Sequence, residues 1–103
     1  MRVEVFPNTV SITVPVALVT PELKAALTAA AGGYTEVPAK GGWVDSTGLV
    51  FEDVNVIISV ACKDDPSEYA AYVAILAEVR RLHNAGEQAV MTTRNGQTYI
   101  YHK

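Results

Sequence analysis

One segment, Tyr34 to Val50, constrains the fold of this 103-residue chain more than any other. It contains the only tryptophan, Trp43, and the densest group of glycines, and it leads directly into the longest β-type run, Val50 to Cys62. Asp45-Ser46-Thr47-Gly48 has the residues of a tight turn, with aspartate first and glycine last. The segment therefore predicts a long β-hairpin, and this hairpin determines most of the architecture.

Two helices are predicted on either side of this hairpin. Thr20-Pro21-Glu22 has the residues of a helix start, and Gly32-Gly33 those of a helix end. Asp65-Pro66-Ser67-Glu68 opens a longer helix, with Asp65 as the cap and Glu68 as the reciprocal partner in a capping box. Asn84-Ala85-Gly86 ends it. Both helices have an apolar stripe, so each is expected to pack on a sheet.

The remaining strands lie at the two ends of the chain. Apolar residues alternate from Val10 to Leu18, with Pro15 expected at a bulge or an unpaired position. Near the C-terminus, Asn95-Gly96 between two alternating runs is a strong hairpin signal. The order of elements predicts an α+β, ferredoxin-like split βαβ fold (βαββαβ) with an added C-terminal hairpin strand. We expect an antiparallel sheet with two helices on one face, in one domain over residues 1–103.

A four-residue turn at Asp45–Gly48 would fix the register of the long hairpin. Lys40 would then oppose Asp53, and Trp43 would oppose Val50 beneath the helices. Lys40, Asp53, Asn55 and Tyr34 would share the open face of the sheet. A bulge at Gly41-Gly42 would move Trp43 or Lys40 to the other face.

Composition limits the classes of function. The net charge of −3 argues against binding to nucleic acid or to an anionic membrane surface. The single cysteine, Cys62, forms no internal disulfide, and no ligand set surrounds His83 or His102, so we expect no metal and no cofactor. No nucleophile stands in a catalytic setting, so no catalytic residue is assigned. The N-terminus does not have the pattern of a signal peptide, and the expected location is cytoplasmic.

The central segment resembles a known family. Gly33-Tyr34-Thr35, the run Gly42-Trp43-Val44-Asp45-Ser46-Thr47-Gly48, and the acidic residue Asp53 before a β-run are similar to the DUF3574 family of small uncharacterised bacterial proteins. That family usually has glutamate where Asp53 stands. The resemblance covers roughly residues 32–91 and implies that Thr35, Trp43 and Asp53 belong together. It implies no activity.

These observations lead to a first hypothesis of a non-enzymatic, homo-oligomeric protein that binds a small polar or anionic ligand, possibly a nucleotide. The predicted ligand site is formed by Lys40, Asp53 and Asn55, with Tyr34 and Tyr101 beside them. One alternative is a cofactor-free enzyme resembling dimeric α+β barrel proteins, with Asp53 or His102 as a base. Another is a protein–protein interaction module such as a phage accessory protein. The open face of the sheet is either a subunit contact or a ligand pocket.

Overall fold

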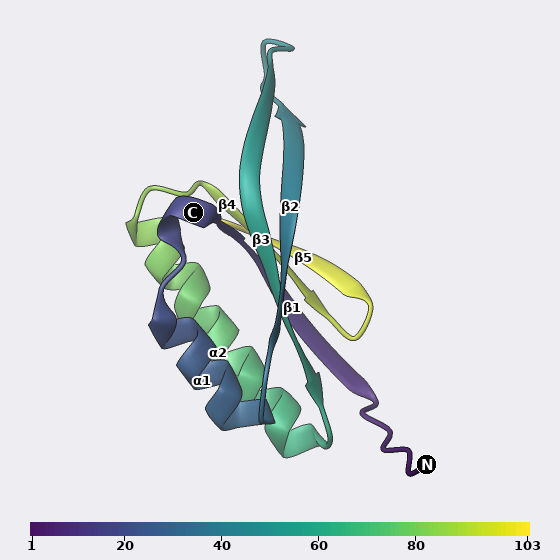
Figure 1. Cartoon of the computed structure of the whole chain (residues 1–103). Coiled ribbons are helices and arrows are strands. Elements are labelled where there is room, and N and C mark those ends of the chain that lie inside the picture. Colours follow the sequence, from purple (N-terminus) through teal and green to yellow (C-terminus); the bar gives the residue numbers. More distant parts are fainter.

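The computed structural model describes all 103 residues, as five strands and two α-helices (Figure 1). A single 3-10 turn, η1, follows the first strand. In chain order the elements are β1 (Asn8–Pro15), η1 (Val16–Leu18), α1 (Pro21–Ala31), β2 (Thr35–Val44), β3 (Val50–Cys62), α2 (Asp65–Asn84), β4 (Ala89–Arg94) and β5 (Gln97–His102).

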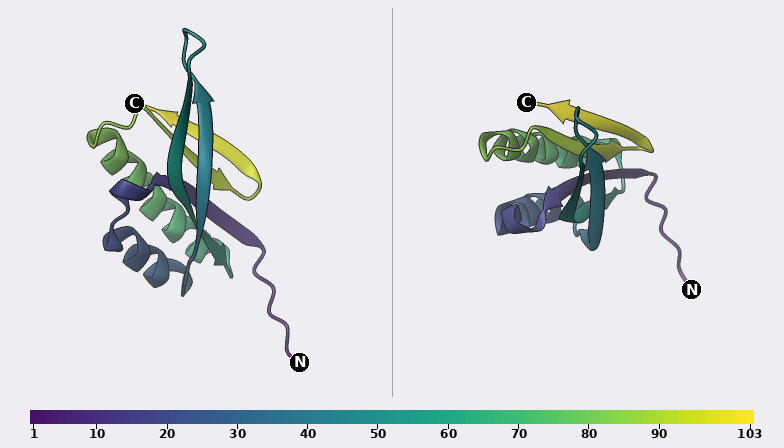
Figure 2. Two further views of the ribbon diagram at one scale, coloured as in Figure 1. Left: turned by 45° about the horizontal axis from the view of Figure 1, so that its top comes forward. Right: turned by 90° about the horizontal axis from the view of Figure 1, so that it is seen from above.

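The strands form one sheet in the order β2-β3-β1-β4-β5, and every neighbouring pair is antiparallel. Both helices lie on the same face of this sheet, and the other face is open (Figures 1 and 2). The first four strands have the order of the ferredoxin-like fold, and β5 is the added strand. The α+β prediction is therefore confirmed, including the two helices on one face.

The helix boundaries follow from local sequence. Thr20 is the N-cap of α1 with Pro21 at the first helical position, and Gly32 ends the helix in the left-handed conformation with φ = +89°. For α2 the predicted N-cap, Asp65, lies one residue after the observed one. Asp64 is the N-cap, and its carboxylate accepts a hydrogen bond of 2.9 Å from the backbone N–H of Ser67. β1 ends at Pro15, earlier than the alternating pattern predicts.

The hydrophobic core lies between the helices and the middle of the sheet. Alternate residues of the central strands face the helices, as the period-two pattern predicts. They meet the apolar stripes of α1 and α2. The buried hydrophobic residues are Val10, Ile12, Val14, Leu23, Leu27, Val56, Ile58, Val60, Cys62, Ala71, Ile75, Val79, Leu82 and Val90.

The predicted register of the β2–β3 hairpin is wrong by one residue. The loop has five residues rather than four, because the backbone N–H of Leu49 donates to the Asp45 carboxylate at 3.0 Å and the N–H of Asp45 donates to the Leu49 carbonyl at 3.0 Å. Leu49 therefore belongs to the loop, and Val44 pairs with Val50. A slip of one residue moves every side chain of β2 to the opposite face.

Because of this difference in register, the predicted position of Trp43 is also wrong. This residue pairs with Phe51, and their rings stack with centroids 4.5 Å apart. Trp43 is 49% exposed and lies on the open face, far from the helices it was expected to pack beneath. The hairpin extends well past the helices (Figure 1), which contributes to the length of 52 Å along the longest axis, against 27 and 21 Å across it.

Candidate functional site between α2 and the last two strands

The sequence-predicted site residues on the hairpin do not converge. Lys40 pairs with Val54, whereas Asp53 pairs with Gly41. Cross-strand partners share a face, so Lys40 lies on the helix-side face and Asp53 on the open face. Asn55, two residues further along β3, shares the face of Asp53. The predicted pairing of an ammonium with a carboxylate is thus absent, and only Asp53 and Asn55 remain neighbours.

The two tyrosines of the predicted site lie elsewhere. Tyr34 precedes β2, and its ring centroid is 5.7 Å from the ammonium of Lys24 on α1. Tyr101 is on β5, at the opposite edge of the sheet from β2. Thr35 shares the open face with Trp43 but lies at the other end of β2, so these two residues do not form one site.

A different set of polar residues converges between α2 and the end of the chain. We call it the polar row: Glu68 and Tyr72 on α2, Arg94 on β4, and Tyr101 on β5. Glu68 is only 7% exposed. The Arg94 guanidinium donates from Nε to one carboxylate oxygen at 2.5 Å and from Nη2 to the other at 3.1 Å. This two-point contact holds a buried carboxylate that would be costly if unpaired.

Tyr72 connects this ion pair to the last strand. The Arg94 guanidinium lies 4.0 Å from the centroid of the Tyr72 ring, a cation–π contact. The Tyr72 and Tyr101 hydroxyl oxygens are 2.8 Å apart. This hydrogen bond, together with burial, raises the pKa of Tyr101 to about 12. Tyr101 therefore keeps its proton to a higher pH than an ordinary tyrosine.

Beside the polar row lies a buried hydroxyl without a hydrogen-bond partner. Thr92 is 2% exposed, and its Oγ1 accepts or donates no hydrogen bond. It stands between Val90 and Arg94 on the helix-side face of β4, and it pairs with Tyr99 of β5. A buried polar group left unpaired costs about 1–3 kcal/mol. Thr92 Oγ1 is the one buried side-chain polar atom without a hydrogen bond, and it lies on the same face of β4 as Arg94.

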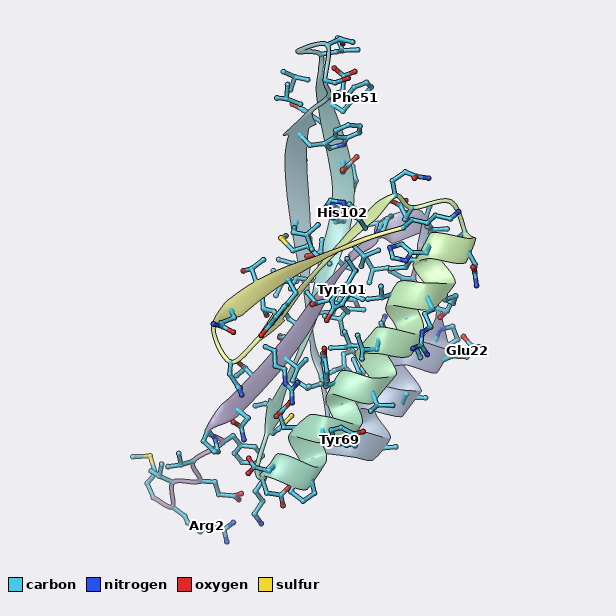
Figure 3. The ribbon with its side chains drawn as sticks, turned by 180° about the vertical axis from the view of Figure 1, so that it is seen from behind. Arg2, Glu22, Phe51, Tyr69, Tyr101 and His102 are labelled. Atoms are coloured by element: carbon cyan, nitrogen blue, oxygen red, sulfur yellow. The ribbon has the colours of Figure 1, made fainter.

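The polar row opens to solvent along β5. The Tyr99 and Tyr101 rings lie side by side with centroids 6.5 Å apart, and Tyr99 is exposed. His83 fixes the strand from the helix side, since its Nε2 lies 2.9 Å from the Tyr101 carbonyl oxygen. Figure 3 shows Tyr101 between β5 and α2. The polar row therefore ends at the rings of Tyr99 and Tyr101, which solvent can reach.

Two shallow hollows lie outside the row. One, of about 280 Å³, is at the end of α1 and is lined by Ala31, Gly32, Gly33, Tyr34, Thr35, Ser59, Val60 and Ala61. The other, of about 240 Å³, lies between the helices, where Arg81 already pairs with Glu78 and donates to the Leu18 carbonyl at 2.5 Å. Neither hollow combines a buried charge with an unpaired polar group.

Of the polar row, the sequence placed only Tyr101 in a ligand site, and it predicted a capping-box role for Glu68. Tyr72 and Arg94 were not predicted as site residues. A signal was nevertheless present, because Glu68 and Tyr72 are four residues apart and so lie on one face of a helix. The sequence did not reveal that Arg94 pairs with Val10 in the sheet, and this pairing is what brings Arg94 close to α2.

Three further observations concern metal ligands, the cysteine and the helices. No three His, Cys, Asp or Glu side chains are grouped so that they could hold a metal ion. Cys62 is buried, and this burial raises the pKa of its thiol. Neither helix has the length and hydrophobicity needed to span a bilayer.

Comparison with known proteins identifies one solved structure with the same fold. No family model matches the chain, and no curated protein matches it, so the resemblance to DUF3574 stays a prediction. A phage SAM lyase in complex with S-methyl-5'-thioadenosine superposes with a TM-score of 0.65, covering 100% of this chain and 95% of the lyase chain. The two sequences are 13% identical, so the likeness is one of fold.

Proposed function

We propose that this chain binds S-adenosylmethionine, or the adenine thionucleoside derived from it, at the polar row. The observation that carries the proposal is a buried carboxylate–guanidinium–tyrosine arrangement in a domain whose structural neighbour holds S-methyl-5'-thioadenosine. The shared fold covers 95% of the lyase chain, so the two proteins have one domain architecture in common. The small-ligand hypothesis is thus retained, but the proposed site is the polar row and not the β2–β3 hairpin.

The chemistry of the ligand matches the groups available. S-adenosylmethionine has an adenine ring, a positively charged sulfonium sulfur, and an amino-acid chain with a carboxylate. The Tyr99 and Tyr101 rings offer faces on which an adenine ring can stack. The Arg94 guanidinium is suited to a carboxylate, and the unpaired Thr92 hydroxyl can serve a ribose or amino group once ligand entry displaces the side chains that bury it.

A sulfonium has no N–H or O–H to donate, so it is recognised by electron-rich ring faces and by carboxylates. Both lie in the polar row. The arrangement of Arg94, which rests on the Tyr72 ring while it pairs with Glu68, supports this part of the proposal, because it is a cation held between a ring and a carboxylate. A sulfonium close to Arg94 would compete with the guanidinium for the Tyr72 ring and the Glu68 carboxylate. The carboxylate of the ligand would then balance the positive charge of the guanidinium.

The second candidate function is cleavage of S-adenosylmethionine at the same site. The ligand of the neighbour favours it, since S-methyl-5'-thioadenosine is what remains when the bond from sulfur to the amino-acid chain breaks and sulfur keeps the electron pair. The sulfur departs as a neutral thioether while the substrate's own carboxylate oxygen bonds to the carbon that the sulfur leaves, which closes a lactone. The step therefore balances without water and needs no acid to protonate the leaving group. The polar row would hold the two ends of the substrate and exclude water.

A thermal-shift series tests the proposal. Stabilisation should grow with ligand concentration as RT ln(1 + [L]/Kd) for S-adenosylmethionine and S-methyl-5'-thioadenosine, and should be smaller for ATP at equal concentration. Chromatography of the same incubations detects any thionucleoside formed. Ligand-dependent stabilisation without product supports a binding protein, and product supports a lyase. An unchanged melting temperature with all three compounds would overturn the proposal and favour the interaction module.

A further inference from the structure

The part of the β2–β3 hairpin that extends past the helices exposes apolar side chains on both of its faces. We call this part, residues 40–54, the arm. Trp43 and Phe51 stack on one face, and most of the remaining apolar residues lie on the other face or in the loop. The exposed apolar residues of the arm are Trp43, Val44, Leu49, Val50, Phe51 and Val54, which are between 37% and 66% exposed.

No other part of the chain covers the arm (Figures 1 and 2). Its six apolar side chains present an area on the order of 500 Å², divided between the two faces of the hairpin and its loop, whereas the largest single patch of a typical monomer is about 300–600 Å². The open face continues this surface with the exposed side chains of Val37, Met91 and Ile100. A partner that covers both faces of the arm together with the open face would bury an apolar area that approaches the roughly 800 Å² per partner of a stable protein interface.

The charges of the arm restrict what can cover it. Asp45, Glu52 and Asp53 are acidic, and Lys40 is the one basic residue among residues 40–54. An acidic, apolar surface disfavours nucleic acid and anionic lipid, both of which need a basic footprint. Protein is the class of partner that remains.

We propose that the arm packs against a second copy of this chain. Only 17 of 103 residues are buried within one copy, so a single chain has a thin core and gains from association. Each copy carries both a projecting apolar arm and an uncovered, partly apolar sheet face, so a second copy supplies a surface that can cover the first. This inference is independent of the ligand.

Trp43 makes the proposal measurable because it is the only tryptophan and lies in the arm. Light scattering gives the mass, and tryptophan emission reports burial of the arm. The test variant is Val54→Glu, in which the new carboxylate faces Lys40 across the strand pair and so leaves the hairpin able to fold. The matched control is Val73→Glu, on an exposed position of α2 away from the arm.

The wild type and Val73→Glu should have a mass of at least twice 11.0 kDa at micromolar concentration, with Trp43 emission shifted to shorter wavelength than in the diluted protein. Val54→Glu should have the mass of one chain and an emission typical of a partly exposed indole, with an unchanged circular dichroism spectrum. A wild-type mass of 11.0 kDa with emission independent of concentration would overturn the proposal. Equal assembly of both variants would do so as well.

Discussion

The Tyr72 and Tyr101 hydroxyl oxygens lie 2.8 Å apart, and this contact joins the middle of α2 to the last strand of the sheet. β5 is an edge strand that pairs only with β4. The bond from His83 to the Tyr101 carbonyl adds a second link to α2. These contacts keep the Tyr99 and Tyr101 rings of β5 in a fixed place beside the Glu68–Arg94 pair, as the proposed ligand site requires.

The hydrogen bond between the two tyrosines predicts a loss of stability at high pH. The pKa of Tyr101 is about 12 in the folded protein against 10.0 for an ordinary tyrosine, so between these values the unfolded state binds fewer protons. The free energy of unfolding contributed by Tyr101 is therefore fully present below about pH 10 and falls as pH rises to about 12. Urea unfolding of wild type and Tyr101→Phe across this range should show the steeper decline in the wild type. Parallel curves would contradict the assignment.

Replacing Arg94 by methionine removes the partner of a buried carboxylate. The Glu68 side chain would keep its burial and lose both charge-assisted hydrogen bonds, at a cost of about 2–3 kcal/mol in the free energy of unfolding. The double variant Glu68→Gln with Arg94→Met should recover part of this loss, because no unpaired charge remains. Chemical denaturation measures both. Equal stability of Arg94→Met and wild type would mean that Glu68 is solvated without its partner.

Thr92→Val separates folding from ligand binding. Valine has nearly the shape of threonine and removes the one buried side-chain polar atom without a hydrogen bond. We expect a gain of about 1 kcal/mol, which corresponds to an increase of about 4–8 °C in melting temperature for a domain of this size. Affinity for S-adenosylmethionine should fall in the same variant. A lower melting temperature would show that the Thr92 hydroxyl is satisfied in solution.

Trp43→Ala should have little effect on the stability of a single copy. Trp43 is half exposed and packs mainly on Phe51, so the loss should be about 0.5–1.5 kcal/mol, the value of an aromatic pair. Measurement in dilute solution keeps the contribution of assembly small. A loss as large as that of a core tryptophan would contradict the exposed position.

The fold follows from the sequence to a large extent because its signals are local. Pro21, the Gly32 left-handed end and the Asn95-Gly96 turn each act within a few residues, so the order of elements and the helix face of β3 could be predicted. The register of the long hairpin depends on one more interaction, the bond from Leu49 to the Asp45 carboxylate. Without it, the side chains of β2 were assigned to the wrong face.

The candidate site could not be predicted in the same way. Glu68 and Arg94 are 26 positions apart and meet only because β4 pairs with β1 beneath α2. Tyr72 matches both a core position and a site position by its spacing alone. Local sequence patterns already explained Glu68 and Tyr72, so nothing in the sequence indicated their contacts with Arg94, which depend on the tertiary structure.

The most direct test of the account is isothermal titration calorimetry of S-adenosylmethionine into Tyr72→Phe and Tyr69→Phe. Both changes remove one hydroxyl from α2, but Tyr72 belongs to the polar row and Tyr69 is exposed on the outer surface of the helix. We predict saturable binding with wild-type affinity for Tyr69→Phe and about tenfold weaker binding for Tyr72→Phe, a difference of about 1.4 kcal/mol. Absence of binding to the wild type, or equal affinity in the two variants, would contradict the polar row as the site.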